Sequence, residues 1–480
     1  MVFSNPWYFV FLAAVLLALA PPASVDARKR VLAVASCLFY AAWDWRYLGL
    51  LLLISVVDYL AADRIDRAEE PAIRRRWLLA SLVANLGVLG GFKYANFFID
   101  NLNGPLGLAG RTLPHLEILL PAGISFYTFK AMSYVIDVYR RELAPVRRYW
   151  DYVTFITFFP ELIAGPIVRA SVLLPQLDRA IGATPERLAS GINIFLQGFT
   201  KKILADRLGR MVDPVFADPA YFDGATAWAA VLAYSLQIFC DFSGYSDMAI
   251  GTGRMIGYDL PRNFAMPYLS ANIAEFWGRW HITLSSWLRD YLYIPLGGNR
   301  RGPGRTTVNL LVTMLLGGLW HGASWNFVAW GGLHGLALGA HRRWGLAGRL
   351  PRPLGVGLTF LFVSLAWIPF RAETFADTWT IFQSLVLLPE GIRWIAPDLA
   401  VIVALCVAGH AFGATLESGS PRLGRALAAV GARVVPDPIR GTYLQLGFVG
   451  LTPAWLMTVW VLLLVLLALT RVSPFIYFQF

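Results

Sequence analysis

Charged residues are scarce in this 480-residue chain: Asp, Glu, Lys and Arg make up only 15% of it. Soluble globular domains carry about 25%. Hydrophobic residues reach 57%, and the mean hydropathy is +0.55. This shortage of charge excludes a soluble enzyme, a disordered scaffold and a secreted disulfide-rich module. Roughly 270 apolar residues suffice for about ten membrane spans of ~20 residues each, so the composition predicts an all-α polytopic membrane protein.

Cysteine and histidine are also rare. The three cysteines, Cys37, Cys240 and Cys406, lie in apolar runs far apart in the sequence. They are interpreted as small core residues, because neither a disulfide framework nor a CxxC metal site has this spacing. No two of the six histidines are separated by four residues, and few carboxylates are near them. We therefore expect no metal site.

Several catalytic signatures are missing as well. The chain has no P-loop, no GxGxxG after a strand, no GxSxG elbow and no DxD pair. Nucleotide hydrolysis, hydride transfer and serine hydrolase chemistry therefore have no support. The net charge of +11 is attributed to cytoplasmic loops, which collect Lys and Arg, and not to nucleic-acid binding.

Long apolar runs alternate with basic clusters along the chain, and they predict about 10–12 transmembrane helices. The runs lie near residues 31–62, 77–99, 116–138, 150–168, 188–205, 226–252, 306–340, 354–370, 397–413 and 447–470. The first is long enough for a tight pair of helices. The run 306–340 is too long for one span and contains Gly317–Gly318 and Gly331–Gly332, so we expect two spans or one broken span.

Residues 261–305 depart from this pattern, because they are rich in Pro, Trp, Arg and Gly. On a single helix with 100° per residue, one face would gather a set of large apolar side chains. These are Trp277, Trp280, Leu284, Trp287, Leu288 and Tyr291. Such a helix is typical of a membrane interface or of a re-entrant element. A simple cytoplasmic amphipathic helix is the alternative.

His321 is the strongest catalytic candidate among the histidines. It lies within an apolar run, between glycines and two tryptophans, in the stretch Gly318–Phe327. An ionisable group at membrane depth is costly and usually faces a cavity. A buried structural histidine is the alternative. His281 lies at the edge of the Trp-rich face and could point toward the same interior.

Two acidic residues form a second candidate cluster. Asp241 and Asp247 lie among Ser, Gly and Tyr inside a hydrophobic run. This pattern suggests a broken helix that borders an aqueous cavity. In a transporter the carboxylates would carry protons or ions, and in an enzyme they would position substrate or orient a helix. The residues alone leave these alternatives open.

Two histidine motifs resemble those of the membrane-bound O-acyltransferases. They are Trp277–Gly298, which reads WGRWHITLSSWLRDYLYIPLGG, and Gly318–Phe327, which reads GLWHGASWNF. Supporting matches are PAGISFYTF from Pro121, FPELIAGP from Phe159 and DFSGYSD from Asp241. Within the family, the sequence is most similar to the membrane subunits of alginate O-acetyltransferases.

The resemblance implies one domain over residues 1–480, with tilted and re-entrant helices around a central tunnel and a catalytic core at 261–340. It makes His321 the catalytic histidine and His281 a second functional one. His321 would act as general base, while His281 would position the donor carbonyl or complete the proton path. Further donor or tunnel candidates are Trp320, Trp280, Asp241, Asp247, Arg279, Arg289, Asp290 and Asn326.

The resemblance also implies the substrates and the location. Acetyl-CoA would be the cytoplasmic donor, with no bound cofactor. The protein would lie in the bacterial inner membrane among lipids, and a periplasmic SGNH-type acetyltransferase would pass acetyl to a polysaccharide, most similar to alginate. The alternatives are a non-catalytic polysaccharide or ion-coupled transporter and a lipid acyltransferase with a longer donor.

The aromatic tail, residues 471–480, contains the sequence FIYFQF. It resembles a C-terminal signature of the small membrane subunit in the D-alanylation branch, where a tyrosine hydroxyl carries the acyl group. Tyr477 is therefore an acyl-carrier candidate. An aromatic belt at the membrane surface is the alternative.

Overall fold

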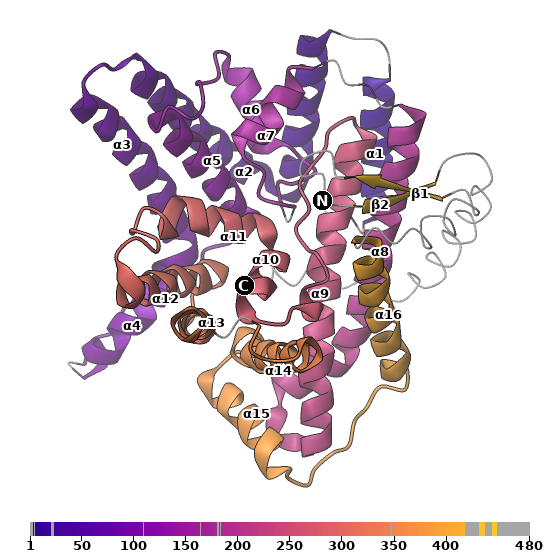
Figure 1. The fold of residues 1–480 in the computed structure, drawn as a ribbon. Helices are drawn as coiled ribbons and strands as arrows, with labels where there is room; N and C mark the ends of the chain where they lie inside the picture. Colours follow the sequence, from indigo (N-terminus) through magenta and orange to yellow (C-terminus); the bar gives the residue numbers. More distant parts are fainter. Residues whose placement is uncertain are drawn as a thin grey trace. The chain divides into compact units, whose positions relative to one another are not determined.

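The computed structural model describes residues 3, 5–20, 24–108, 110–163, 165–179, 182, 184–345, 348–417, 432–436 and 444–448. Apart from two short strands, the regular elements of these residues are all helices (Figure 1). They form two compact units. The first is Met1–Gly191 with Ala249–Leu260, and the second comprises the described residues within Ile192–Met248 and Pro261–Phe480. The predicted all-α class is confirmed, while a single domain over 1–480 stays a prediction.

The first unit contains α1 to α7 and parts of two longer helices. Its elements are α1 (Pro6–Leu19), α2 (Val25–Arg67), α3 (Pro71–Leu89), the π-helical η1 (Gly90–Tyr94), α4 (Ala95–Gly107), α5 (Ile124–Tyr139), α6 (Tyr149–Thr157) and α7 (Ala170–Leu177). The unit boundaries fall inside α8 (Pro185–Ala217) and α9 (Gly224–Met255). The run 31–62 lies in α2, where two helical segments meet at a kink at Asp44, whose φ is −158° and ψ is 115°. The expected two helices are therefore present, joined by this kink.

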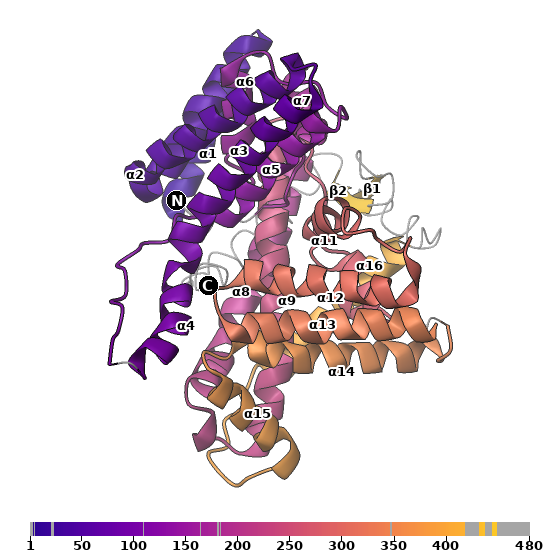
Figure 2. The same cartoon turned by 90° about the vertical axis from the view of Figure 1, so that its left-hand side faces the viewer.

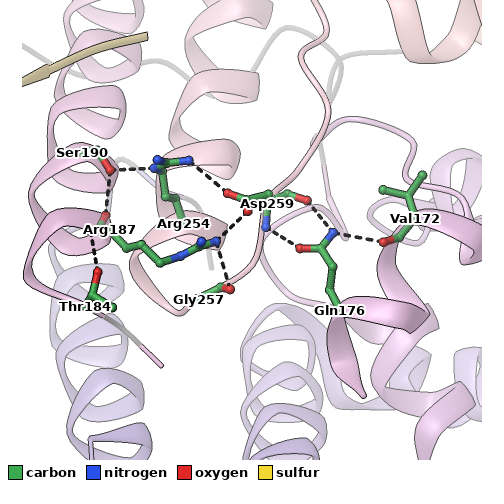
Figure 3. Close-up of polar contacts among 8 residues, drawn as sticks. All are labelled: Val172, Gln176, Thr184, Arg187, Ser190, Arg254, Gly257 and Asp259. Carbon is green, nitrogen blue, oxygen red and sulfur yellow. Dashed lines mark hydrogen bonds and ion pairs between the residues drawn. The ribbon is translucent and has the colours of Figure 1, made fainter. Parts of the chain in front are cut away.

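Asp259 joins three helices of the first unit (Figure 3). Its carboxylate accepts hydrogen bonds from Arg187 on α8 at 2.7 Å and from Arg254 on α9 at 3.0 Å. Its backbone N–H donates to the Gln176 side chain on α7 at 2.8 Å, and its carbonyl accepts from the same side chain at 2.9 Å. The loop after α9 is therefore fixed by charge-assisted bonds.

The second unit carries the segments that were singled out for function. Its elements are η2 (Pro219–Tyr221), η3 (Pro267–Leu269), α10 (Ile273–Arg279), α11 (Ile282–Leu288), the π-helical η4 (Arg289–Tyr293), α12 (Gly302–His321), α13 (Trp325–Trp344), α14 (Arg352–Arg371), α15 (Phe375–Leu387), α16 (Leu399–Glu417), β1 (Ala432–Pro436) and β2 (Leu444–Phe448). The antiparallel pair β1–β2, with Val434 opposite Leu446, was not predicted.

Helices α12, α13 and α14 lie side by side in the second unit (Figures 1 and 2). The run 306–340 is indeed broken, but at Gly322–Ser324 and not at its glycine pairs. Gly318 and Gly331 lie inside the helices, where they allow α12 and α13 to pack closely. A Cβ on Gly318 would be 2.2 Å from the Phe327 carbonyl oxygen, and one on Gly331 would be 2.2 Å from that of Met314.

By length and composition, three helical stretches of the described residues are able to cross a membrane: Pro71–Gly107, Gly224–Met255 and Arg352–Arg371. The expected number was about 10–12. Two shorter apolar helical stretches, Pro6–Leu19 and Leu399–Thr415, fall below the length of a full span, and residues 449–470 of the predicted run 447–470 lie outside the described residues. Only 17% of the apolar window in Pro71–Gly107 is buried, as expected for a helix that faces lipid.

Candidate active site

His321 ends α12 inside an aromatic enclosure. The helix stops because Gly322 is extended, and Ser324 then caps α13 by accepting a hydrogen bond from the Asn326 N–H. The His321 residue is only 4% exposed. Its ring centroid lies 4.9 Å from that of Trp320, 5.0 Å from that of Trp330 and 5.2 Å from that of Phe370. The imidazole is thus held in a largely dehydrated environment.

His281 lies at a sharp turn between two short helices. Its φ of +41° is unusual for a residue with a side chain. The residue is completely buried, with its ring 4.6 Å from that of Phe242. Its ring centroid lies 6.4 Å from that of His321. The structure therefore brings together the two histidines that the sequence selected.

The turn at His281 corrects the expected helical wheel. Residues 277–291 do not form one helix, because α10 ends at Arg279 and α11 begins at Ile282. The tryptophans of the predicted face are buried. Trp277, Trp280 and Trp287 are at most 8% exposed and lie in the protein interior. A single amphipathic helix over these residues is therefore wrong, whereas the re-entrant or interfacial location of the segment stays a prediction.

The predicted helix break at Asp241–Asp247 is also wrong, because α9 is continuous through both residues. Gly244 lets α8 come close, since a Cβ there would be 2.7 Å from the Gly198 carbonyl oxygen. As a result, Lys202 lies 2.7 Å from Asp241, and Lys201 lies 2.6 Å from Asp247. Both carboxylates are therefore paired with lysines of α8.

The chain matches the model described as MBOAT, membrane-bound O-acyltransferase family, over residues 146–357. It is 45% identical over 410 residues to the probable alginate O-acetylase AlgI of Azotobacter vinelandii, covering 83% of this chain and 80% of that protein. This chain belongs to the membrane-bound O-acyltransferase family. The probable alginate O-acetylase AlgI of Pseudomonas aeruginosa is 45% identical, and the match covers 80% of this chain and 75% of that protein. A peptidoglycan O-acetyltransferase of Helicobacter pylori is 39% identical, and the match covers 75% of this chain and 73% of that protein.

Membership of the membrane-bound O-acyltransferase family confirms the resemblance and makes the chain a membrane-bound acyltransferase. The non-catalytic transporter is therefore set aside. The matched region contains both His281 and His321. Their catalytic roles stay predictions, as does the central tunnel.

The other donor or tunnel candidates predicted from the sequence lie at several places in the second unit. Trp280 is 1% exposed and packs against Trp367 at 5.0 Å, whereas Asn326 donates to the Ala372 carbonyl at 2.9 Å. Arg279 pairs with Glu275 on its own helix. Arg289 and Asp290 pair with each other at 2.6 Å on η4. Tyr477 lies outside the described residues.

Sequence reasoning missed several neighbours of the two histidines. Trp330 and Phe370 enclose His321, and Trp330 also contacts the buried His334, whose Nδ1 accepts from Trp277 Nε1 at 3.3 Å. The i, i+4 spacing of Trp330 and His334 indicates one helical face, but only the packing of α12 on α13 places that face beside His321.

No group of three or more His, Cys, Asp or Glu side chains in the described part of the chain is arranged to hold a metal ion. Cys240 and Cys406 nevertheless come together, with their sulfur atoms 3.6 Å apart as free thiols. The two cysteines are 166 residues apart in the sequence, so no local pattern predicts this contact between α9 and α16.

Proposed function

We propose that this acyltransferase takes acetyl from cytoplasmic acetyl-CoA for the O-acetylation of an extracytoplasmic polysaccharide, in the bacterial inner membrane. The observation that carries the proposal is the pair of buried imidazoles, His281 and His321, with ring centroids 6.4 Å apart. The names of the relatives, alginate O-acetylase and peptidoglycan O-acetyltransferase, support acetyl as the group and a glycan as the final acceptor.

In the proposed reaction, His321 is the general base. Its neutral nitrogen takes the proton of the acceptor hydroxyl while that oxygen attacks the thioester carbonyl carbon. The carbon–sulfur bond breaks, and the CoA thiolate leaves with the proton that the imidazolium returns. The products are the acetyl ester and CoA. Because the aromatic rings around His321 exclude water, the thioester is protected from hydrolysis.

The donor is proposed to approach over a basic loop. Arg300 and Arg301 are exposed between η4 and α12, and Arg305 is exposed in the first turn of α12. Three guanidinium groups attract the phosphates of CoA through their field and through hydrogen bonds. Arg279 does not belong to this group, because it is paired with Glu275.

The acetyl group is then proposed to pass to a periplasmic SGNH-type acetyltransferase, with Tyr477 as an intermediate carrier. In this route the acceptor hydroxyl of the reaction above is the Tyr477 phenol, whose oxygen attacks the thioester with His321 as base. The partner enzyme then takes the acetyl group from the tyrosyl ester and regenerates the free phenol. Tyr477→Phe keeps the aromatic ring and removes only this oxygen. We expect the variant to lose acetyl labelling of the chain; normal polymer acetylation by Tyr477→Phe would exclude the carrier role and leave an aromatic belt.

The proposed function is tested with the purified chain in proteoliposomes that receive acetyl-CoA labelled in the acetyl group. We expect CoA release that depends on added acceptor or on the partner enzyme, and label in the acetylated product. Palmitoyl-CoA is the matched control donor. Consumption of palmitoyl-CoA without consumption of acetyl-CoA would favour a lipid acyltransferase and overturn the proposal.

A further inference from the structure

Asn263 contacts His281 and organises the whole turn at this residue. Its backbone oxygen accepts a hydrogen bond from the Ile282 N–H at 2.9 Å. Its side-chain oxygen Oδ1 accepts from the Thr283 N–H at 3.2 Å and from the Thr283 hydroxyl at 2.9 Å. The same Oδ1 lies 3.2 Å from Nδ1 of His281. One residue thus satisfies the first N–H groups of α11 and stabilises the positive φ of His281.

The orientation of the Asn263 amide follows from these partners. A backbone N–H can only donate, so the atom that faces the Thr283 N–H must be the amide oxygen and not the amide nitrogen. The amide nitrogen, on the other side, donates to the Ser246 hydroxyl on α9 at 3.3 Å. Asn263, Thr283 and Ser246 are all buried, so water does not replace any of these partners of the amide.

The fixed amide determines the protonation of His281. An amide oxygen accepts only, so the nearby Nδ1 must carry a proton; two lone pairs would otherwise face each other at 3.2 Å. In the neutral ring the lone pair then lies on Nε2. This proton is assigned from the hydrogen-bond network.

We infer that Asn263 is a positioning residue that fixes His281 as the Nδ1–H tautomer and so makes its Nε2 a hydrogen-bond acceptor. The inference rests on the proposed function, in which His281 either positions the donor carbonyl or completes the proton path. A carbonyl oxygen needs a donor, which a neutral His281 does not offer at Nε2. His281 therefore serves the proton path: it accepts from a hydroxyl or from a protonated neighbour.

The tautomer is measured directly by nitrogen NMR on the full chain in lipid, labelled with ¹⁵N-histidine. His281→Gln identifies the His281 signals by their loss. We expect Nδ1 to carry the proton in the unmodified protein and Nε2 to carry it in Asn263→Leu, which keeps the side-chain size but has no acceptor. A proton on Nε2 in the unmodified protein would overturn the inference.

Enzyme kinetics provide a second, independent readout. Asn263→Leu should lower kcat about 10–100-fold, as expected when a partner that orients a functional histidine is lost, while KM for acetyl-CoA changes little. Asn263→Asp keeps an acceptor at this position and adds a negative charge, which stabilises a protonated imidazole. We expect this variant to retain more activity than Asn263→Leu and to shift the acid limb of its pH–rate profile to higher pH.

Asn309→Leu is the matched control. Asn309 is equally buried in the same unit, and its amide donates to the Gly298 carbonyl at 2.9 Å without touching a histidine. This variant should leave the His281 tautomer and the pH–rate profile unchanged. If Asn263→Leu behaved like Asn309→Leu in both measurements, Asn263 would be structural only. A different outcome is that the unmodified protein shows the Nδ1–H tautomer while His281→Ala retains full acetyl transfer. This outcome would refute the proposed role of His281 in the reaction and leave the tautomer assignment valid.

Discussion

The ring centroids of His281 and His321 lie 6.4 Å apart, although the two residues are 40 positions apart in the sequence and lie on different elements. At this separation the rings do not hydrogen-bond each other directly, but both can reach one small group bound beside them. The two residues should therefore act on the same reaction.

His281→Ala is expected to lower kcat for acetyl transfer, by about 10²–10⁴-fold if His281 carries a proton in the transition state. The variant also removes the contact of the ring with Phe242, so its melting temperature must be measured alongside. His410→Ala is the control, because His410 is another buried histidine that packs on an aromatic ring, Phe239. Equal activity of both variants would make His281 a packing residue.

Lys202→Met should destabilise the protein strongly. The Lys202 side chain is 1% exposed, and its ammonium lies 2.7 Å from Asp241 and 2.8 Å from Asp206. Removal of one partner leaves buried charge without compensation, which typically costs about 3–5 kcal/mol.

The neighbouring Lys201 is the matched control, since its side chain is 32% exposed and water can solvate Asp247 when it is removed. Thermal unfolding in detergent should show a larger decrease in melting temperature for Lys202→Met than for Lys201→Met. The double variant Lys202→Met/Asp241→Asn should recover part of the loss. Equal melting temperatures for both single variants would contradict the buried ion pair.

Cys240 and Cys406 should form a disulfide when membranes are treated with a mild oxidant. Their sulfur atoms lie 3.6 Å apart, so a small approach suffices to reach bonding distance. The thiols are oxidised and the added oxidant is reduced. Mass spectrometry of peptides from the treated protein detects the cross-link. Cys37 should form no disulfide with either Cys240 or Cys406. A failure of Cys240 and Cys406 to cross-link would place α16 elsewhere than beside α9.

Neutralising Arg300 and Arg301 should raise KM for acetyl-CoA and leave kcat nearly unchanged, because both side chains are exposed and attract the donor through charge. The increase should shrink at high ionic strength. Arg279→Gln should behave differently. It breaks the pair with Glu275 and so lowers protein yield more than donor affinity. An unchanged KM for the double variant would leave Arg300 and Arg301 as topology signals.

The sequence predicted the helical class, the two histidines and the break near 306–340, because these depend on local composition and spacing. The features that depend on packing between distant segments were predicted wrongly or missed. The wheel over residues 277–291 assumed one helix, but Asn263, far outside that window, stabilises a turn at His281. Likewise, the pairing of Asp241 with Lys202 requires the close approach of α8 and α9 at Gly198 and Gly244, which no local pattern reveals.

The central claim is that His321 is the general base, and His321→Ala tests it most directly. Polymer acetylation is measured in cells that lack the native gene and express either this variant or His341→Ala, whose half-buried side chain lies at the far end of α13. We expect normal acetylation with His341→Ala. His321→Ala should reduce it about 10²–10⁴-fold at an unchanged level of folded protein in the membrane. Near-normal acetylation with His321→Ala would contradict the account.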